Sequence, residues 1–330
     1  MKARVFSGMQ PSGELHIGNW LGALRKWVEL SRAEDFDAIF CVVDAHAVTI
    51  DYEPKAFRQR ILEAATGYLA AGIDSERSVV FVQSDVREHT ELCWYLSCCT
   101  QMGELQRMTQ FKDKSEQHKH NVNAGLFTYP VLMAADVLLY RASVVPVGDD
   151  QVQHLELSRE IARRFNQRYK RKVFPEPMPM LSKAPRIMGL DGQAKMAKSR
   201  GNTIALSDGE KEVWNKLKGA FTDPQRLRRE DPGRPEVCNI FLMHKALGSE
   251  EAVEQIAMDC RSAAIGCGDC KKNLHGVLMS ELGPVQERLL SLRKRPDDVW
   301  DILRAGASRC RPWAQQTMVD VRSCMGVGTP

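Results

Sequence analysis

Residues 8–24 read GMQPSGELHIGNWLGAL and carry the most informative pattern of the chain. They separate a short apolar run, ARVF at 3–6, from a helix-like segment, NWLGALRKWVEL at 19–30. Pro and Gly between the two indicate a tight turn that leaves a strand, and Gly18 stands where the helix would begin. Backbone N–H groups at such a helix start lack partners within the helix and bind phosphate. The stretch therefore predicts a phosphate-binding turn.

The first half of the chain continues this alternation of strand and helix. The expected strands lie at 4–7, 37–43, 78–83 and 143–147, and the expected helices at 18–30, 54–71, 89–100, 126–140 and 149–168. Fully apolar strands separated by amphipathic helices predict a parallel sheet covered on both faces, which is a doubly wound α/β fold. Its ligand would lie at the carboxyl ends of the strands. A polar segment, KDKSEQHKHNVN at 112–123, is expected to be a surface loop beside that site.

The second half of the chain differs, because from residue 208 onward only helical patterns occur, such as EKEVWNKLKGAF at 210–221. A Pro-rich stretch at 172–186 precedes a second polar loop, MGLDGQAKMAKSRGNT at 188–203. We therefore expect an α/β domain at 1–204 that includes this loop. A mostly helical domain follows at 205–330. Its last helix could pack back on the first domain.

Composition limits the class of protein. The 330 residues are 43% apolar and 27% charged, which is ordinary for a globular protein. No apolar stretch is long enough for a membrane span, and the first residues carry no secretory pattern, so we expect a cytoplasmic protein with no membrane partner. The net charge is only +4, yet basic residues crowd at 159–172 and 226–229. Either run suits contact with a phosphate backbone, and either is equally explained as a solvated helix face.

Two short motifs point to the chemistry. HIGN at 16–19 and KMAKS at 195–199 resemble the paired HIGH and KMSKS signatures of class I aminoacyl-tRNA synthetases. The resemblance implies a Rossmann-like catalytic domain that holds ATP with Mg²⁺ while an amino acid carboxylate attacks the α-phosphorus and pyrophosphate leaves. Asn19 and Ala197 depart from the usual motifs, and Ala197 removes a hydroxyl that could bind phosphate. The catalytic residues that the resemblance implies are His16, Asn19, Lys114, Lys195 and Lys198, although Lys114 is almost as well explained as a solvated lysine.

Longer segments narrow the resemblance to tryptophanyl-tRNA synthetases. They are GMQPSGELHIGN at 8–19, VVDAHAVT at 42–49, GELQRMTQFKDKS at 103–115, AGLFTYPVLMAADVLLY at 124–140 and VPVGDDQVQHLEL at 145–157. This likeness implies that Asp136 accepts the indole N–H of tryptophan; without the likeness, the simpler interpretation is a helix aspartate that bonds solvent or backbone. The other implied tryptophan contacts are Phe6, Gln10, His46, Tyr129, Met133 and Gln151. The implied ATP contacts are Gln10, Ser12, Gly18, Asn19, Gly148, Asp150, Ile187, Lys195, Met196, Lys198 and Ser199, and Asp150 also reads as a plain N-cap.

The implied partners are tRNA(Trp), L-tryptophan and a second copy of the chain. Three other functions stay open at this point. A tyrosyl enzyme of the same subclass would pair a Tyr with an Asp to read a phenol, whereas this chain has YPVLMAAD. A small-molecule adenylyltransferase would leave the lysine loop and the helical half unexplained. A paralogue that binds RNA without charging it is favoured only by Ala197.

Four of the ten cysteines have an organised spacing, with 21, six and two residues between Cys238, Cys260, Cys267 and Cys270. A CxxC pair can chelate one centre, and four thiolates could hold either zinc or a 4Fe–4S cluster. In a reducing compartment disulfides are not expected. A subset of tryptophanyl-tRNA synthetases has a similar pattern, with a first spacer one residue longer, that binds a 4Fe–4S cluster in the helical domain. The resemblance therefore implies such a cluster, with zinc as the alternative occupant and unligated thiols as a third possibility.

Overall fold

The computed structural model describes residues 2–117, 119–181, 188–192, 196 and 200–329. Its contacts divide the chain into two compact units. The sheet unit comprises Met1–Gly13, Lys26–Ser182 and Leu292–Pro330, and the helical unit comprises Glu14–Arg25 and Lys183–Ser291. No helix of the described residues is both long enough and apolar enough to cross a membrane.

The sheet unit is built on five parallel strands in the order β3-β2-β1-β4-β5. Their bounds are β1 Ala3–Met9, β2 Phe36–Val42, β3 Val79–Val82, β4 Val144–Val147 and β5 Met178–Leu181. Every residue of β3 and the last five of β2 are buried, as expected for strands covered on both faces. The predicted doubly wound α/β fold is confirmed. The sequence pattern missed β5, because Pro179 argues against a strand; β5 is an edge strand, where a missing N–H is tolerated.

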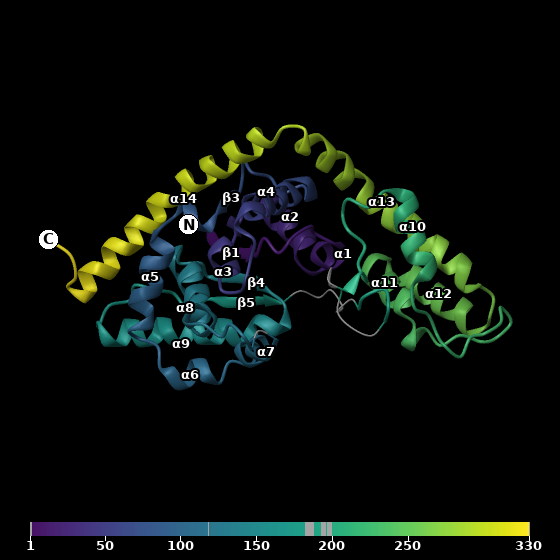
Figure 1. The fold of residues 1–330 in the computed structure, drawn as a ribbon, viewed down its shortest axis with the longest axis horizontal. Helices are drawn as coiled ribbons and strands as arrows, with labels where there is room; N and C mark the ends of the chain where they lie inside the picture. The colour runs from purple at the N-terminus through teal and green to yellow at the C-terminus, as the bar shows by residue number, and fades with distance from the viewer. Residues whose placement is uncertain (1, 118, 182–187, 193–195, 197–199, 330) are drawn as a thin grey trace. The chain divides into compact units, whose positions relative to one another are not determined.

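Helices connect these strands and cover them (Figure 1). Those of the sheet unit are α2 Arg25–Arg32, α3 Asp44–Ala47, α4 Pro54–Ala71, α5 Glu88–Ser97, α6 Met102–Gln106, α7 Thr109–Gln117, α8 Ala124–Leu139, α9 Val152–Arg168 and α14 Pro296–Met325. Short 3-10 turns, η2 Gln83–Asp85 and η3 Asp149–Gln151, follow β3 and β4. On β2, Phe40 stacks against Trp27 with ring centroids 5.0 Å apart, and Tyr68 of α4 meets Trp27 edge-on at 5.2 Å.

The expectation of a loop at 112–123 was wrong for its first part, since α7 runs through Gln117. Lys, Glu and Gln are good helix formers, and no Gly or Pro interrupts this stretch. Phe111 of α7 also packs edge-on against Phe127 of α8, with ring centroids 5.1 Å apart. Polarity alone therefore did not indicate a loop here.

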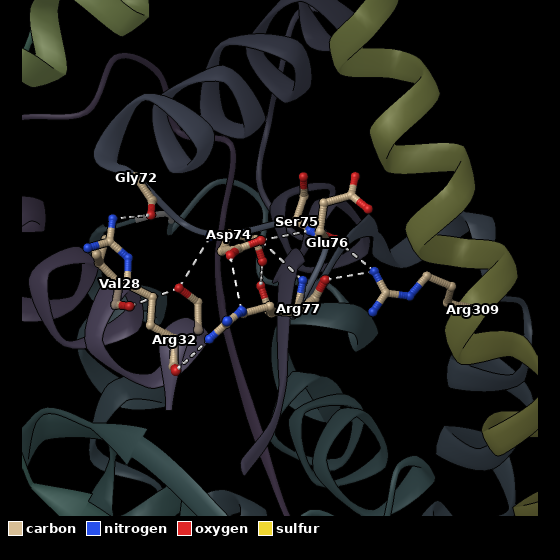
Figure 2. Close-up of polar contacts among 10 residues, drawn as sticks. Val28, Arg32, Gly72, Asp74, Ser75, Glu76, Arg77 and Arg309 are labelled. Atoms are coloured by element: carbon tan, nitrogen blue, oxygen red, sulfur yellow. Dashed lines mark hydrogen bonds and ion pairs between the residues drawn. The ribbon is translucent and has the colours of Figure 1, made fainter. Parts of the chain in front are cut away.

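Asp74 organises the turn between α4 and β3 (Figure 2). Its Oδ1 accepts the backbone N–H groups of Glu76 and Arg77 at 3.0 and 3.1 Å. Arg309 of α14 donates to the carbonyl oxygen of Ser75 in the same turn at 2.7 Å. A helix more than two hundred residues away in sequence is thereby tied to the turn that leads into β3, an edge strand of the sheet.

In the helical unit, residues 14–25 pack with residues 183–291. Its elements are α1 Ile17–Asn19, a π-helical turn η1 Trp20–Leu24, α10 Glu210–Gly219, η5 Pro235–Val237, α11 Asn239–Leu247, α12 Glu250–Arg261 and most of α13 Cys267–Arg293. The Ile17 N–H donates to the Ile204 carbonyl and the Leu206 N–H to the Leu15 carbonyl, both at 2.9 Å. Trp20 Nε1 donates to Glu281 of α13 at 2.8 Å.

Helix α14 contacts the backbone of β3 directly at Gly306, where a Cβ would lie 1.9 Å from the Val80 carbonyl oxygen. Gly306→Ala therefore forces helix and strand apart and should lower the unfolding free energy by at least about 2 kcal/mol. Urea unfolding followed by circular dichroism measures this change. The matched control is Gly276→Ala in α13, where no atom lies within 4 Å of the added methyl. This control should stabilise by up to about 1 kcal/mol through helix propensity. Equal midpoints for the two variants would contradict the direct contact.

Candidate functional site

Polar residues gather in the sheet unit just beyond the carboxyl ends of β2 and β3. His46 lies in α3, which begins two residues after β2, and Gln83 directly follows β3. Asp136 comes from α8, and the Ala45 N–H donates to Gln83 Oε1 at 3.1 Å. The carboxyl ends of adjacent parallel strands form the usual ligand-binding edge of such a sheet. The structure therefore brings a carboxylate, an amide and an imidazole to that edge.

Asp136 is the centre of this group and is buried, with 2% of its surface exposed. Its Oδ1 accepts from Gln83 Nε2 and from His89 Nδ1, both at 2.6 Å, and its Oδ2 accepts from His46 Nε2 at 2.8 Å. Burial alone would raise the pKa of Asp136, but His46 and His89 outweigh burial and hold that pKa below its usual value. The group is therefore a charged acceptor held by hydrogen bonds.

Aromatic side chains surround this carboxylate. Tyr129, Met133 and Asp136 are spaced by four and three residues and so lie on one face of α8. The rings of His46 and Tyr129 meet edge-on, with centroids 6.3 Å apart. Phe6 of β1 stacks on Tyr140, with centroids 5.6 Å apart. An acceptor among rings is suited to an aromatic ligand that carries an N–H donor.

Lys114 lies against the same face. Its Nζ is 4.4 Å from the centre of the Tyr129 ring, a cation–π contact, and burial lowers the pKa of its ammonium. The Tyr129 hydroxyl is 2.8 Å from His154 Nε2, and both groups are buried. These contacts place Lys114 beside the aromatic residues instead of in bulk water.

Several other predicted contacts follow β1 and β4. Gln10 comes directly after β1, and its carbonyl accepts the Ser12 N–H at 2.8 Å. Gly148 precedes η3, which includes Asp150 and Gln151; Gly148 and Asp150 are exposed, and Gln151 is half-buried. The N-cap of α9 is Gln151 and makes no side-chain cap bond, so Asp150 is not the plain N-cap of that helix.

The HIGN segment belongs to the helical unit and caps its own helix. His16 Nδ1 accepts the Gly18 N–H at 3.1 Å, and Asn19 Oδ1 accepts the His16 N–H at 3.0 Å. A Cβ at Gly18 would lie 2.9 Å from the His16 ring and 3.8 Å from Cβ of Met196. Glycine is thus needed for the close approach of His16, and Met196 of the second motif lies beside the first. Ile187, Lys195, Lys198 and Ser199 lie outside the described residues.

The four spaced cysteines lie in the helical unit, near enough for the other three to act on the charge of Cys270. Cys238 precedes α11, Cys260 lies in α12, and Cys267 and Cys270 lie in the first turn of α13. Burial, followed by the charges of the other three thiols, raises the pKa of Cys270 to about 12. Arg226 donates to Cys260 Sγ at 3.7 Å. Even so, no group of three or more His, Cys, Asp or Glu is arranged to hold a metal ion within the described part of the chain.

Comparison with known proteins identifies the family. The family "tRNA synthetases class I (W and Y)" matches residues 1–282. The tryptophan–tRNA ligase of Deinococcus radiodurans is 47% identical over 327 residues, which cover 98% of both chains, and that of Thermotoga maritima is 44% identical over 328 residues, which cover 98% of this chain and 99% of the relative. The chain belongs to the class I tRNA synthetases. Tryptophanyl-tRNA synthetase from Campylobacter jejuni, solved with ADP and tryptophan, has 36% identity and a TM-score of 0.84, and the match covers 98% of this synthetase and all of that chain.

Sequence reasoning overlooked two residues that touch Asp136 in this synthetase, Gln83 and His89. Gln83 carried a usable signal, since a polar residue directly after a fully apolar parallel strand points to the ligand edge. His89 carried none, because a histidine in the first turn of an amphipathic helix is most simply a surface residue. Only packing shows that this ring is 1% exposed.

The synthetase should lose stability with acid through His154. Burial, with smaller contributions from Lys114 and His46, lowers the pKa of His154 to about 4. Between pH 6.5 and 4 the unfolded chain binds a proton that the folded chain does not, so stability falls as pH falls through that window, by up to about 3 kcal/mol. His154→Gln cannot take up that proton. Urea unfolding from pH 7 to 4 should therefore show a shallower loss of stability for the variant. Parallel curves for the two proteins would contradict this assignment.

Proposed function

We propose that this synthetase is a tryptophan–tRNA ligase. It activates L-tryptophan with ATP to tryptophanyl-adenylate, releases pyrophosphate, and transfers the aminoacyl group to the terminal adenosine of tRNA(Trp). The observation that carries the proposal is the buried, charged Asp136 acceptor among aromatic rings. Relatives named tryptophan–tRNA ligase, similar over nearly the whole chain, support it.

Tryptophan would be recognised through its indole N–H, which Asp136 accepts, while Phe6, His46, Tyr129 and Met133 flank the ring. Gln10 and Gln151 would orient the polar end of the amino acid. Phenylalanine leaves the buried carboxylate without its ligand donor, and the loss of one such hydrogen bond discriminates strongly. A tyrosyl enzyme needs a partner for a phenol hydroxyl; the Tyr129 hydroxyl instead pairs with His154, which supports tryptophan as the substrate.

Adenylation would depend on residues from both motifs. We assign catalytic roles to His16, Asn19, Lys114, Lys195 and Lys198, whose donors and positive charges oppose the charge that develops on the phosphates. ATP would contact Gln10, Ser12, Gly18, Asn19, Gly148, Asp150, Ile187, Lys195, Met196, Lys198 and Ser199. Mg²⁺ would bind through the ATP phosphates and neutralise their charge. A Mg²⁺ ion bound in this way needs no dedicated cage of protein ligands. The position of Met196 beside Gly18 supports joint action of the two motifs.

The remaining features complete the proposal. Residues 1–204 form the catalytic domain and 205–330 the anticodon-binding domain, whose last helix returns to the catalytic domain. The enzyme acts in the cytoplasm as a homodimer. Exposed Trp94 and Met102, with 68% and 64% of their surfaces accessible, support a covered face at α5 and α6.

We also propose that Cys238, Cys260, Cys267 and Cys270 bind a 4Fe–4S cluster, with zinc as the alternative. Burial, together with the charges of neighbouring thiols, raises the pKa of Cys238, Cys260 and Cys270, and a cationic centre bound by these thiolates would offset that cost. Arg226, whose side chain also donates to the carbonyls of Arg229 and Ile265, would hold the loops around such a centre. The cluster supplies no electron for adenylation, so we assign it a structural and RNA-contacting role.

Asp136→Asn tests the recognition of tryptophan. The change keeps the size of the side chain but removes its charge and presents an amide to the indole N–H. The KM for tryptophan in pyrophosphate exchange should rise about 100-fold or more. The KM for ATP should stay within about threefold, which serves as the internal control. Unchanged kinetics with tryptophan would remove Asp136 from the proposal, and no exchange by the unaltered protein with any amino acid would favour a non-charging RNA-binding paralogue.

Cys267→Ser tests the cluster in anaerobically purified protein. The unaltered protein should show the brown absorbance of iron–sulfur and about four irons per chain, and the variant should lose both. Cys98→Ser, at an exposed cysteine outside the set, should change neither and is the matched control. Zinc with no iron in the unaltered protein would establish the alternative occupant. Iron retained by the variant would show that the ligand set is wrong.

A further inference from the structure

His89 is buried beside the proposed specificity carboxylate and contacts it directly. Its Nδ1 donates to Asp136 Oδ1 at 2.6 Å, and its Nε2 lies 2.8 Å from the Tyr140 hydroxyl. The ring packs between Phe81 and Tyr140, with centroid distances of 5.8 and 5.4 Å. Its orientation is therefore fixed by a contact at each ring nitrogen and by stacking on Phe81.

His89 links Asp136 to Tyr140 in a chain of hydrogen-bonded groups. A carboxylate oxygen only accepts hydrogen bonds, so His89 Nδ1 carries the hydrogen that Asp136 Oδ1 accepts. The Nε2 atom on the other side of the ring lies within hydrogen-bonding distance of the Tyr140 hydroxyl. The Tyr140 oxygen lies 3.7 Å from Cys310 Sγ of α14, a weak contact that closes the chain.

The three donors around Asp136 leave one of its lone pairs for a ligand. A carboxylate has about four lone-pair directions, two on each oxygen. Within the described residues, Gln83 and His89 both donate to Oδ1, and His46 donates to Oδ2. One direction is left, and it belongs to Oδ2. The two donors on Oδ1 stop the carboxylate from turning to present a different lone pair.

We propose that His89 is a positioning residue for tryptophan recognition, which holds Oδ1 of Asp136 so that one lone pair of Oδ2 is aimed at the indole N–H. The inference rests on the proposed function. It extends that function by assigning specificity to a side chain that the substrate does not touch. Without His89 the carboxylate stays buried but can rotate toward its remaining donors, and the N–H of the ligand loses its partner.

Two polar variants separate this role from simple packing. The amide nitrogen of His89→Asn can occupy the place of Nδ1 and keep the bond to Asp136. His89→Gln reaches the place of Nε2, keeps the bond to Tyr140 and loses the bond to Asp136. The readout is the ratio of kcat/KM for tryptophan to kcat/KM for an analogue in which sulfur replaces the indole N–H, measured by pyrophosphate exchange.

The unaltered enzyme should favour tryptophan over the sulfur analogue by about 10- to 100-fold, the value of a hydrogen bond to a charged group. H89N should keep this ratio within about threefold. H89Q should reduce it at least about tenfold through a higher KM for tryptophan, with the KM for ATP unchanged. If H89Q shows the same ratio as the unaltered enzyme, whatever the melting temperature of the variant, this inference is overturned while the proposed function stands. No activation of tryptophan by the unaltered enzyme would overturn the proposed function and this inference with it.

A second measurement uses the unaltered protein and does not depend on how the variants fold. In a sample with ¹⁵N-labelled histidine, the His89 Nδ1–H resonance should shift when tryptophan is added and should stay in place with the sulfur analogue. An equal response to both ligands would overturn the inference, because it would show that the imidazole does not sense the indole N–H.

Discussion

The buried carboxylate of Asp136 is the constraint on which the rest of the site depends. An isolated charge in an apolar core is costly, so each of its oxygens needs donors. Three side chains supply them from α3, the end of β3 and α5, and the carboxylate itself comes from α8. The Asp136 carboxylate therefore links the helices and the strand that meet at the ligand-binding edge of the sheet. Specificity and local architecture share the same hydrogen bonds.

Helix α14 supports this arrangement through its contact with β3, an edge strand of the sheet. The close approach at Gly306 brings the helix against the backbone of β3, and Arg309 binds the turn that leads into that strand. One helical turn further on, Cys310 reaches the Tyr140 hydroxyl that contacts His89. Helix α14 thus contacts both β3 and the Tyr140 side chain that lies against His89. Glycine at position 306 allows the helix to approach the strand this closely.

Much of the fold could be predicted from sequence because apolar runs and helical periods are local signals. Four of the five strands were expected close to their observed bounds. The pattern failed at Met178–Leu181, where proline masks an edge strand, and at α7, where a polar helix was read as a loop. Asp136, His46 and Tyr129 were named from a resemblance, and Gln83 and His89 were missed.

The sequence by itself determined the α/β class, the order of the strands along the chain and, through HIGN and KMAKS, the synthetase family. Only the tertiary structure decided which donors hold Asp136 and which lone pair they leave. Those donors lie 47, 53 and 90 residues from the carboxylate. Periodicity reports which face of an element is buried, but it does not report what that face meets. Neighbours so distant in sequence are chosen by the packing of the whole sheet unit, so hydrogen-bond partners are a property of the fold and not of any local pattern.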